Sequence, residues 1–416
     1  RFVPQAVEDC GQKGVKNIII NSGGFSEIGP EGEAYEKDFL ARAKKYGIRM
    51  FGPNCQGVIN SDPDIRAYCN FTFTRLIPGH ISLVAQSGGV AVVINNRLYE
   101  LEAGIRMYAS NGNACDISIP EILSYWGDDD ETRVIVCHVE SLSDPAEFLR
   151  VAAEVSRRKP ILGLKTGRTL EGSRAVSSHT GGMIKEDTTT ELIFEEAGVV
   201  SFHDQMALCD AAYAFARQPI PAGNRVGIVT NAGGPGIVAT DEVIEAGCEI
   251  PGLSEVTQKR LREALFDEAI IANPVDTLAT GRPEHYREEL EAMLSDPAID
   301  SILVNFITPF FVDCEGVARE IAAVFPQAEK PIIGIVMTQK VAWASSLSTL
   351  REAGIPVFDF PETGTRALGA MVRYGKLRNS PDEPAPSFDD TDPELAETII
   401  DEAIFSGLEH LPQAAA

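Results

Sequence analysis

The sequence lacks the features that are typical of nucleic-acid-binding proteins and of membrane proteins. Its 416 residues contain 36 lysines and arginines against 61 aspartates and glutamates, which gives a net charge of −25. A phosphate backbone would be repelled by this charge. No apolar run approaches the roughly twenty residues that cross a bilayer, and no signal peptide is visible. We therefore expect no nucleic-acid partner and no membrane partner.

Paired cysteine patterns are also missing. The eight cysteines are scattered, with no C-x-x-C pair and no cluster with histidine. In a chain of this length such spacing is typical of reduced thiols rather than of a disulfide framework or a zinc site. The sequence therefore predicts a cytoplasmic protein that holds no metal through its own side chains.

Apolar, β-rich runs alternate with amphipathic runs from end to end, which is the pattern of parallel βαβ units. Because the predicted strands are apolar on both faces, helices should cover both sides of each sheet. The predicted strands are 15–21, 49–52, 81–85, 105–110, 133–139, 161–165, 225–230, 301–307, 331–336 and 357–358. The predicted helices include 33–46, 90–102, 145–158, 204–216, 236–246, 314–325 and 341–353.

The chain is too long for a single core, so we expect two or three domains. Pro- and Gly-containing stretches at 72–80 and 218–224 indicate two boundaries. The Pro- and Asp-rich run 380–392 predicts an exposed linker, followed by a last helix at 393–406. Neither end resembles a natural terminus, so the sequence reads as a fragment cut at both ends.

Two segments share one design, in which a strand ends in small residues and a helix follows at once. The unpaired N–H groups of a helix start and its dipole favour an anion, and a Cβ would hold a phosphate oxygen away from them. The residues predicted to bind phosphate are Ser87, Gly88 and Gly89 in the first segment and Gly233, Gly234 and Gly236 in the second. A ligand-free turn and a dinucleotide site are the alternatives, although no complete glycine fingerprint is present. A Walker A motif is excluded.

His179 is the candidate nucleophile, in the small-residue run 177–182 (Ser-Ser-His-Thr-Gly-Gly). An imidazole nitrogen can attack phosphorus when the other nitrogen is held by a carboxylate. Glu140 follows a predicted strand, and ligand groups of open α/β sheets gather at strand carboxyl ends. A solvated histidine and a surface glutamate are the alternatives. His138 lies in an apolar strand and is predicted to be structural, whereas the remaining histidines are predicted to be solvated, namely His80, His203, His285 and His410.

Taken together, these motifs resemble those of nucleoside-diphosphate-forming acyl-CoA synthetases, of the ADP-forming acetyl-CoA synthetase type and related to succinyl-CoA synthetase. The resemblance spans nearly the whole chain in order, at 52–57 (Gly-Pro-Asn-Cys-Gln-Gly), 86–89 (Gln-Ser-Gly-Gly), 165–168 (Lys-Thr-Gly-Arg), 177–181 (Ser-Ser-His-Thr-Gly), 231–236 (Asn-Ala-Gly-Gly-Pro-Gly) and 273–276 (Asn-Pro-Val-Asp).

The resemblance implies an acid–thiol ligase that forms acyl-CoA, ADP and phosphate reversibly from a carboxylic acid, CoA and ATP, through an acyl phosphate and a phosphohistidine. His179 matches the phosphorylated histidine and Glu140 the carboxylate that orients it. The two glycine turns match the two helix starts that bind its phosphate. The positions that match the CoA and acyl site are Ser22, Gly23, Gly24, Phe25, Asn54 and Cys55. Cys55 is expected to pack beside the CoA thiol and not to act as a nucleophile.

The resemblance also implies an architecture of successive doubly wound parallel-sheet α/β domains. Residues 1–74 would form part of a Rossmann-like CoA-binding domain, 75–218 a flavodoxin-like domain with the histidine, and 224–377 a second flavodoxin-like domain. Residues 378–416 would lead to an ATP-grasp module, in the same chain or another subunit, that binds ATP or ADP and Mg²⁺ and is missing here. The first glycine loop of the CoA-binding domain is missing as well. The family commonly forms oligomers.

Two other readings stay open from the sequence. One is a catalytically silent CoA- or acyl-CoA-sensing module of a fused acetyltransferase, although the presence of both His179 and Glu140 favours an enzyme. The other is a dinucleotide-dependent oxidoreductase. No single residue of the sequence indicates which carboxylic acid is the substrate.

Overall fold

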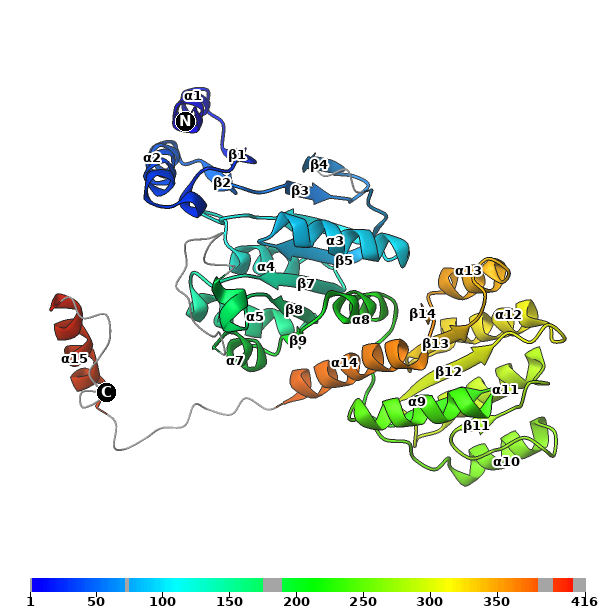
Figure 1. The fold of residues 1–416 in the computed structure, drawn as a ribbon. Coiled ribbons are helices and arrows are strands. Elements are labelled where there is room, and N and C mark those ends of the chain that lie inside the picture. The colour runs from blue at the N-terminus through cyan, green and yellow to red at the C-terminus, as the bar shows by residue number, and fades with distance from the viewer. Residues whose placement is uncertain (1, 72–74, 175–188, 381–391, 407–416) are drawn as a thin grey trace. The chain divides into compact units, whose positions relative to one another are not determined.

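The computed structural model describes residues 2–71, 75–174, 189–380 and 392–406, in two compact units, 1–378 and 379–416 (Figure 1). The second unit contains helix α15 (Pro393–Phe405), close to the predicted 393–406. The first unit contains three sheets of two, seven and five strands. Within the described ranges, none of the helices combines the length and the apolar character that crossing a bilayer requires.

The two-stranded sheet pairs β1 (Asn17–Ile19) with β2 (Arg49–Phe51) in parallel. Helices α1 (Val3–Gln12) and α2 (Pro30–Tyr46) pack against each other beside it, and Phe39 and Met50 lie in their shared core. A 3-10 turn, η1 (Ser26–Ile28), precedes α2.

The seven-stranded sheet has the order β4-β3-β6-β5-β7-β8-β9. Strand β3 runs antiparallel to both neighbours, and the remaining pairs are parallel. Residues 57–70 therefore belong to this sheet, although the sequence assigns them to the CoA-binding domain. The strands are β3 (Gly57–Asn60), β4 (Ala67–Asn70), β5 (Pro78–Ala85), β6 (Ile105–Ser110), β7 (Val134–Val139), β8 (Ile161–Lys165) and β9 (Val200–Phe202).

Helices cover both faces of this sheet, as the apolar strands predicted (Figure 1). Neighbouring residues of a strand point to opposite faces, and Leu83 and Val84 accordingly lie in two different cores. Helices α3 (Gly88–Glu100) and α8 (Gln205–Arg217) pack on the Leu83 side. The Val84 side is covered by α4 (Ile119–Gly127), α5 (Pro145–Ser156) and α7 (Thr189–Glu196).

The five-stranded sheet is parallel throughout, in the order β11-β10-β12-β13-β14. Its strands are β10 (Val226–Thr230), β11 (Val275–Asp276), β12 (Ser301–Ile307), β13 (Ile332–Met337) and β14 (Val357–Phe358). Helices α9 (Gly233–Glu245) and α14 (Pro361–Asn379) share one core with it. The other core is built with α10 (Glu255–Ala264), α11 (Pro283–Ser295), α12 (Cys314–Val324) and α13 (Ala344–Glu352), with the turn η2 (Phe325–Gln327) after α12.

The fold class predicted from the sequence is confirmed, and β6, β8, β12 and β14 have the predicted bounds. The predicted strands do not include β3, β4, β9 and β11, and the predicted helices do not include α1, α4, α7, α10, α11 and α14. Glycines interrupt the helical sequence pattern of α14. They stand where close packing against neighbouring residues leaves no space for a side chain. A Cβ on Gly364 would lie 2.9 Å from Cγ1 of Ile335, and one on Gly369 would lie 2.9 Å from Cβ of Ala246.

His285 corrects the prediction that it is solvated, because only 5% of the residue is exposed. It lies in the first turn of α11, where its Nδ1 accepts a hydrogen bond from the backbone N–H of Arg282 (3.1 Å). Burial lowers its pKa. His203 is exposed, as predicted, and His410 lies outside the described residues.

Glu289 lies fully buried on the inner face of α11. Among the described residues, neither of its carboxyl oxygens has a hydrogen-bond partner. Burial, and to a lesser degree the charge of Asp276, raises the pKa of Glu289 well above its ordinary value. The carboxyl group is therefore protonated in the folded chain at neutral pH.

This buried acid makes stability depend on pH. Unfolding at pH 7 exposes the carboxyl group and releases its proton, so the free energy of unfolding falls as pH rises above the ordinary glutamate pKa. We expect Glu289→Gln to remove this dependence, so that its advantage over the wild type grows by up to about 1.4 kcal/mol per pH unit between about pH 5 and 8. Urea unfolding across that range measures the difference.

The control is Glu288→Gln, because the Glu288 side chain is 38% exposed and paired with Arg260. It should leave the wild-type pH profile in place. Parallel pH profiles for the wild type and Glu289→Gln would contradict a buried, protonated Glu289.

Candidate active site

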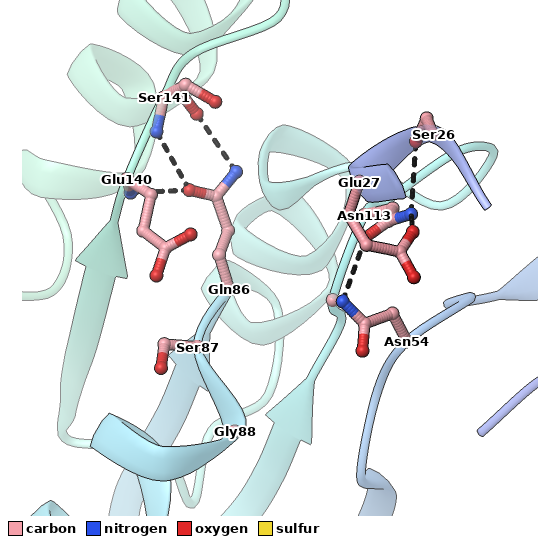
Figure 2. A pocket seen from close by; sticks show the side chains of 10 residues that line it. Ser26, Glu27, Asn54, Gln86, Ser87, Gly88, Asn113, Glu140 and Ser141 are labelled. Atoms are coloured by element: carbon pink, nitrogen blue, oxygen red, sulfur yellow. Dashed lines mark hydrogen bonds between the residues drawn. The ribbon is translucent and has the colours of Figure 1, made fainter. Parts of the chain in front are cut away.

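A cavity of about 530 Å³ opens at the carboxyl ends of β5, β6 and β7 (Figure 2). Loops from the first, two-stranded part of the chain complete it. Its ten lining residues are Ser26, Glu27, Asn54, Gln86, Ser87, Gly88, Gly112, Asn113, Glu140 and Ser141. The cavity therefore brings together four of the predicted site residues, Ser87, Gly88, Asn54 and Glu140.

The start of α3 forms one wall of the cavity. Ser87 is the N-cap residue, and its hydroxyl accepts a hydrogen bond from the backbone N–H of Val90 (3.3 Å). A Cβ on Gly89 would meet only Oγ of Ser87, at 3.8 Å, so packing does not explain the glycine there. Ser87 caps the N–H of Val90 and the Gln56 side chain lies beside Gly88, while the earlier N–H groups of the helix and the positive end of its dipole can bind an anion.

Glu140 follows β7, and its backbone is fixed from two sides. Its N–H donates to Oε1 of Gln86 (2.5 Å), and the carbonyl of Glu140 accepts from Nζ of Lys165 (2.8 Å). Gln86 also binds both backbone groups of Ser141, through its oxygen (3.0 Å) and its nitrogen (2.9 Å). Figure 2 shows the Glu140 carboxylate beside Ser87. His179, its predicted partner, lies outside the described residues, so that contact remains a prediction.

The predicted CoA and acyl residues are divided between the cavity wall and the core. Asn54 follows the cis peptide bond Gly52–Pro53 and has a φ of 55°. Its backbone N–H donates to the carbonyl of Ser22 (2.9 Å), which connects the two predicted motifs. Phe25 packs edge-on against Phe39, with ring centroids 5.2 Å apart.

Cys55 is buried behind this loop, with its Sγ 3.4 Å from the carbonyl oxygen of Ile20. Burial raises the pKa of Cys55 to about 11. A thiol protonated at neutral pH is a poor nucleophile. This chemistry agrees with the packing role expected for Cys55.

The start of α9, with Gly233, Gly234 and Gly236, is a separate feature. In the described part of the chain no side chain caps this helix, and a Cβ on Gly234 would meet no described atom within 4 Å. A Cβ on Gly233 would lie 3.5 Å from Oδ2 of Asp276. None of the three glycines is among the described residues that line the cavity. The structure therefore brings one predicted phosphate-binding helix start to Glu140, and not the other.

Sequence reasoning missed the acidic wall of the cavity. Glu27 accepts hydrogen bonds from the N–H groups of Gly24 (2.5 Å) and Phe25 (3.1 Å) and from Nδ2 of Asn113 (2.6 Å). Burial would raise the pKa of Glu27, but the bonds from Asn113 and the Gly24 amide outweigh it and lower the pKa. Asn113 follows β6, so the rule that ligand groups gather at strand carboxyl ends could have found it.

His138 is fully buried in β7, with Nε2 3.1 Å from Oγ1 of Thr166. Burial, helped by the charge of Lys165, lowers the pKa of His138 to about 4. The ring is neutral at physiological pH, in keeping with its predicted structural role.

Comparisons with known proteins agree with this geometry. Residues 1–61 match the CoA binding domain, 78–215 the succinyl-CoA ligase like flavodoxin domain, and 226–379 the ligase-CoA domain. The alpha subunit of ADP-forming acetate–CoA ligase II of Pyrococcus furiosus is 34% identical over 90% of this chain and 82% of its own length. The chain belongs to the ADP-forming acyl-CoA synthetases. This confirms the predicted family and enzyme class.

Two other relatives differ in extent. The ADP-forming acetate–CoA ligase of Methanocaldococcus jannaschii is also 34% identical, over 90% of this chain but only 53% of its own length. A structure of dinucleotide-forming acetyl-coenzyme A synthetase 1 of Ca. Korarchaeum cryptofilum, in complex with phosphate and ADP, superposes with a TM-score of 0.85. It is 28% identical and covers 91% of this chain and 81% of that one.

Gly112 lies in the cavity wall at a position that leaves no space for a side chain. Its φ is +57°, and a Cβ there would overlap the backbone oxygens of Pro53 and Asn54. We expect Gly112→Ala to displace the Asn54 loop, to lower the free energy of unfolding by about 1–3 kcal/mol, and to lower kcat/KM for the carboxylic acid. Urea unfolding and steady-state assays of the assembled enzyme measure both.

Gly47→Ala is the matched control, because Gly47 also has a left-handed φ (64°) but open space around its Cβ position. It should lose stability and retain activity. Equal activity losses in the two variants would contradict a specific role for the contact between Gly112 and Asn54.

Proposed function

We propose that this chain carries the acyl-phosphate and phosphohistidine steps of acyl-CoA synthesis from a carboxylic acid, CoA and ATP, with ADP and phosphate as products. The observation that carries the proposal is the cavity in which the α3 start, at Ser87 and Gly88, meets Glu140 and Asn54. An anion-binding helix start beside a fixed carboxylate is what a histidine phosphoryl carrier requires.

In the direction of synthesis, the roles divide as follows. A nitrogen of His179 receives a phosphoryl group from ATP, which leaves as ADP, and the carboxylate of the substrate then attacks that phosphorus to form an acyl phosphate and free the imidazole. The CoA thiolate attacks the acyl carbon and releases phosphate. The Glu140 carboxylate accepts a hydrogen bond from the N–H of the second ring nitrogen. The first ring nitrogen then carries the lone pair that attacks phosphorus. N–H groups at the α3 start, with Ser87, Gly88 and Gly89, hold the phosphate oxygens.

The second phosphate position is proposed at the α9 start, with Gly233, Gly234 and Gly236. Because these glycines are not among the described residues that line the cavity, the α9 start would hold the phosphoryl group at a separate position, through a helix dipole and without a tight salt bridge that would keep it from being transferred. CoA and the acyl group are proposed to bind along Ser22, Gly23, Gly24 and Asn54, with Phe25 and Cys55 packed beneath that surface. The backbone bond between Asn54 and Ser22 supports one continuous binding surface.

Nucleotide and Mg²⁺ are proposed to bind to an ATP-grasp domain or subunit, with which this chain assembles in an oligomer. We also propose the domain division 1–74, 75–218, 224–377 and 378–416, in which β3 and β4 of the first domain complete the sheet of the second. The three matched family ranges support this division. A cytoplasmic location is supported by the cysteines, which are free thiols.

The phosphohistidine is tested with γ-labelled ATP and Mg²⁺ on the assembled enzyme. We expect a label on this chain that is labile in acid and stable in base, and we expect it to vanish in His179→Ala. His203→Ala is the matched control, because the His203 side chain is 60% exposed, and it should retain the label. An unlabelled wild-type chain would contradict the relay and favour a sensing module.

Glu140 is tested separately, because its role is to orient the ring. We expect Glu140→Gln to slow phosphorylation about a hundredfold or more while the fold is retained, since Gln cannot stabilise a developing imidazolium. Rapid-quench phosphorylation measures the rate, and Glu147→Gln, on the exposed first turn of α5, is the control. An unchanged rate would mean that another residue orients His179.

A further inference from the structure

Resting on the proposed function, we propose that the cavity selects a short monocarboxylic acid with a hydroxyl group near the end of its tail. It discriminates against dicarboxylic acids and against acids with an apolar tail. The discriminating residues are Glu27 and Asn54, on the wall opposite Gln86 and Glu140 (Figure 2).

The described lining of the cavity is mostly polar. Of its ten described lining residues, eight have polar side chains and two are glycines. An apolar tail gains its binding free energy by leaving water for apolar surface, at about 25 cal/mol per Å². Among the described residues apolar surface is the smaller part of this lining, and the tail would also take water away from polar groups that it cannot bond. A branched or aromatic acid is therefore a poor fit.

The cavity also has a direction. The α3 start, at Ser87 and Gly88, offers backbone donors and the positive end of a dipole on one side. Glu27, Asn54 and Asn113 lie on the other side (Figure 2). A carboxylic acid whose carboxylate attacks a phosphoryl group held at the α3 start would therefore direct its tail toward Glu27.

The Glu27 side presents acceptors to that tail. The carboxylate of Glu27 is held by three N–H donors and is ionised, so it can only accept. The Asn113 nitrogen donates to Ser26, Glu27 and Glu36. The side-chain nitrogen of Asn54 donates a hydrogen bond to Oδ1 of Asn113 (3.3 Å). The other polar atom of the Asn54 amide is its own Oδ1, which is an acceptor.

An acceptor wall with a negative charge distinguishes three kinds of tail. A hydroxyl group donates a charge-assisted hydrogen bond to the carboxylate of Glu27. A methyl group of the same size leaves that carboxylate desolvated and without the bond. A second carboxylate is repelled by Glu27. These differences act on binding of the acid and so on kcat/KM.

The test compares three acids of similar size with the assembled enzyme, CoA and ATP: 3-hydroxypropanoate, butyrate and malonate. We expect kcat/KM for 3-hydroxypropanoate to exceed the values for butyrate and for malonate at least about tenfold, since a hydrogen bond to a charged group has this magnitude. Equal or higher values for butyrate or malonate would overturn the proposal.

Variants identify the residue responsible. In Glu27→Gln, the ratio of kcat/KM for malonate to that for 3-hydroxypropanoate should rise about tenfold, and in Asn54→Asp it should fall. Glu36→Gln is the matched control, because Glu36 contacts the same Ser26 and Asn113 but does not line the cavity. It should leave the ratio unchanged.

The outcomes separate this inference from the proposed function. A ratio that is unchanged in both Glu27→Gln and Asn54→Asp, with active enzyme, would overturn the selection and leave the phosphohistidine steps standing. A wild-type enzyme that forms neither acyl-CoA with any of the acids nor phosphohistidine would overturn the proposed function, and the inference with it.

Discussion

The hydrogen bonds of the Gln86 amide are the constraint on which the site depends. The parallel register pairs Ala85 of β5 with His138 of β7, so that Gln86 and Glu140 emerge at the same edge of the sheet. One amide then binds the backbones of Glu140 and Ser141. Since the next residue, Ser87, caps α3, the carboxylate and the anion-binding helix start are held as one unit. The register of two stiff strands sets the distance between them, and the Gln86 side chain fixes it.

The cavity combines two electrostatic surroundings within one open space. The α3 start attracts an anion through neutral dipoles, whereas Glu27 keeps a negative charge because N–H donors surround it. The first part of the chain supplies Glu27 and Asn54, and the seven-stranded sheet supplies the helix start and Glu140. The cavity therefore needs both parts, and Gly112 is the close contact that joins them.

Much of the fold could be predicted because apolar strands such as β6, β8 and β12 carry their own signal. The short β3–β4 hairpin joins the sheet because β3 pairs with β6. This pairing joins distant parts of the chain, so the local sequence pattern does not indicate it. At the site, Gly88 and Glu140 follow recognisable strands, so the rule that ligand groups gather at strand carboxyl ends indicated both as candidate site residues. Glu27 and Asn113 are 86 residues apart and their bond depends on loop geometry, which only the folded chain shows.

The most direct test of the account is a crystal structure of the assembled enzyme with orthophosphate and CoA. The account predicts phosphate on the backbone N–H groups of the first turn of α3, near Gly88 and Gly89, with a ring nitrogen of His179 hydrogen-bonded to the Glu140 carboxylate. Phosphate bound away from both glycine turns, or a His179 ring enclosed in apolar packing, would contradict it.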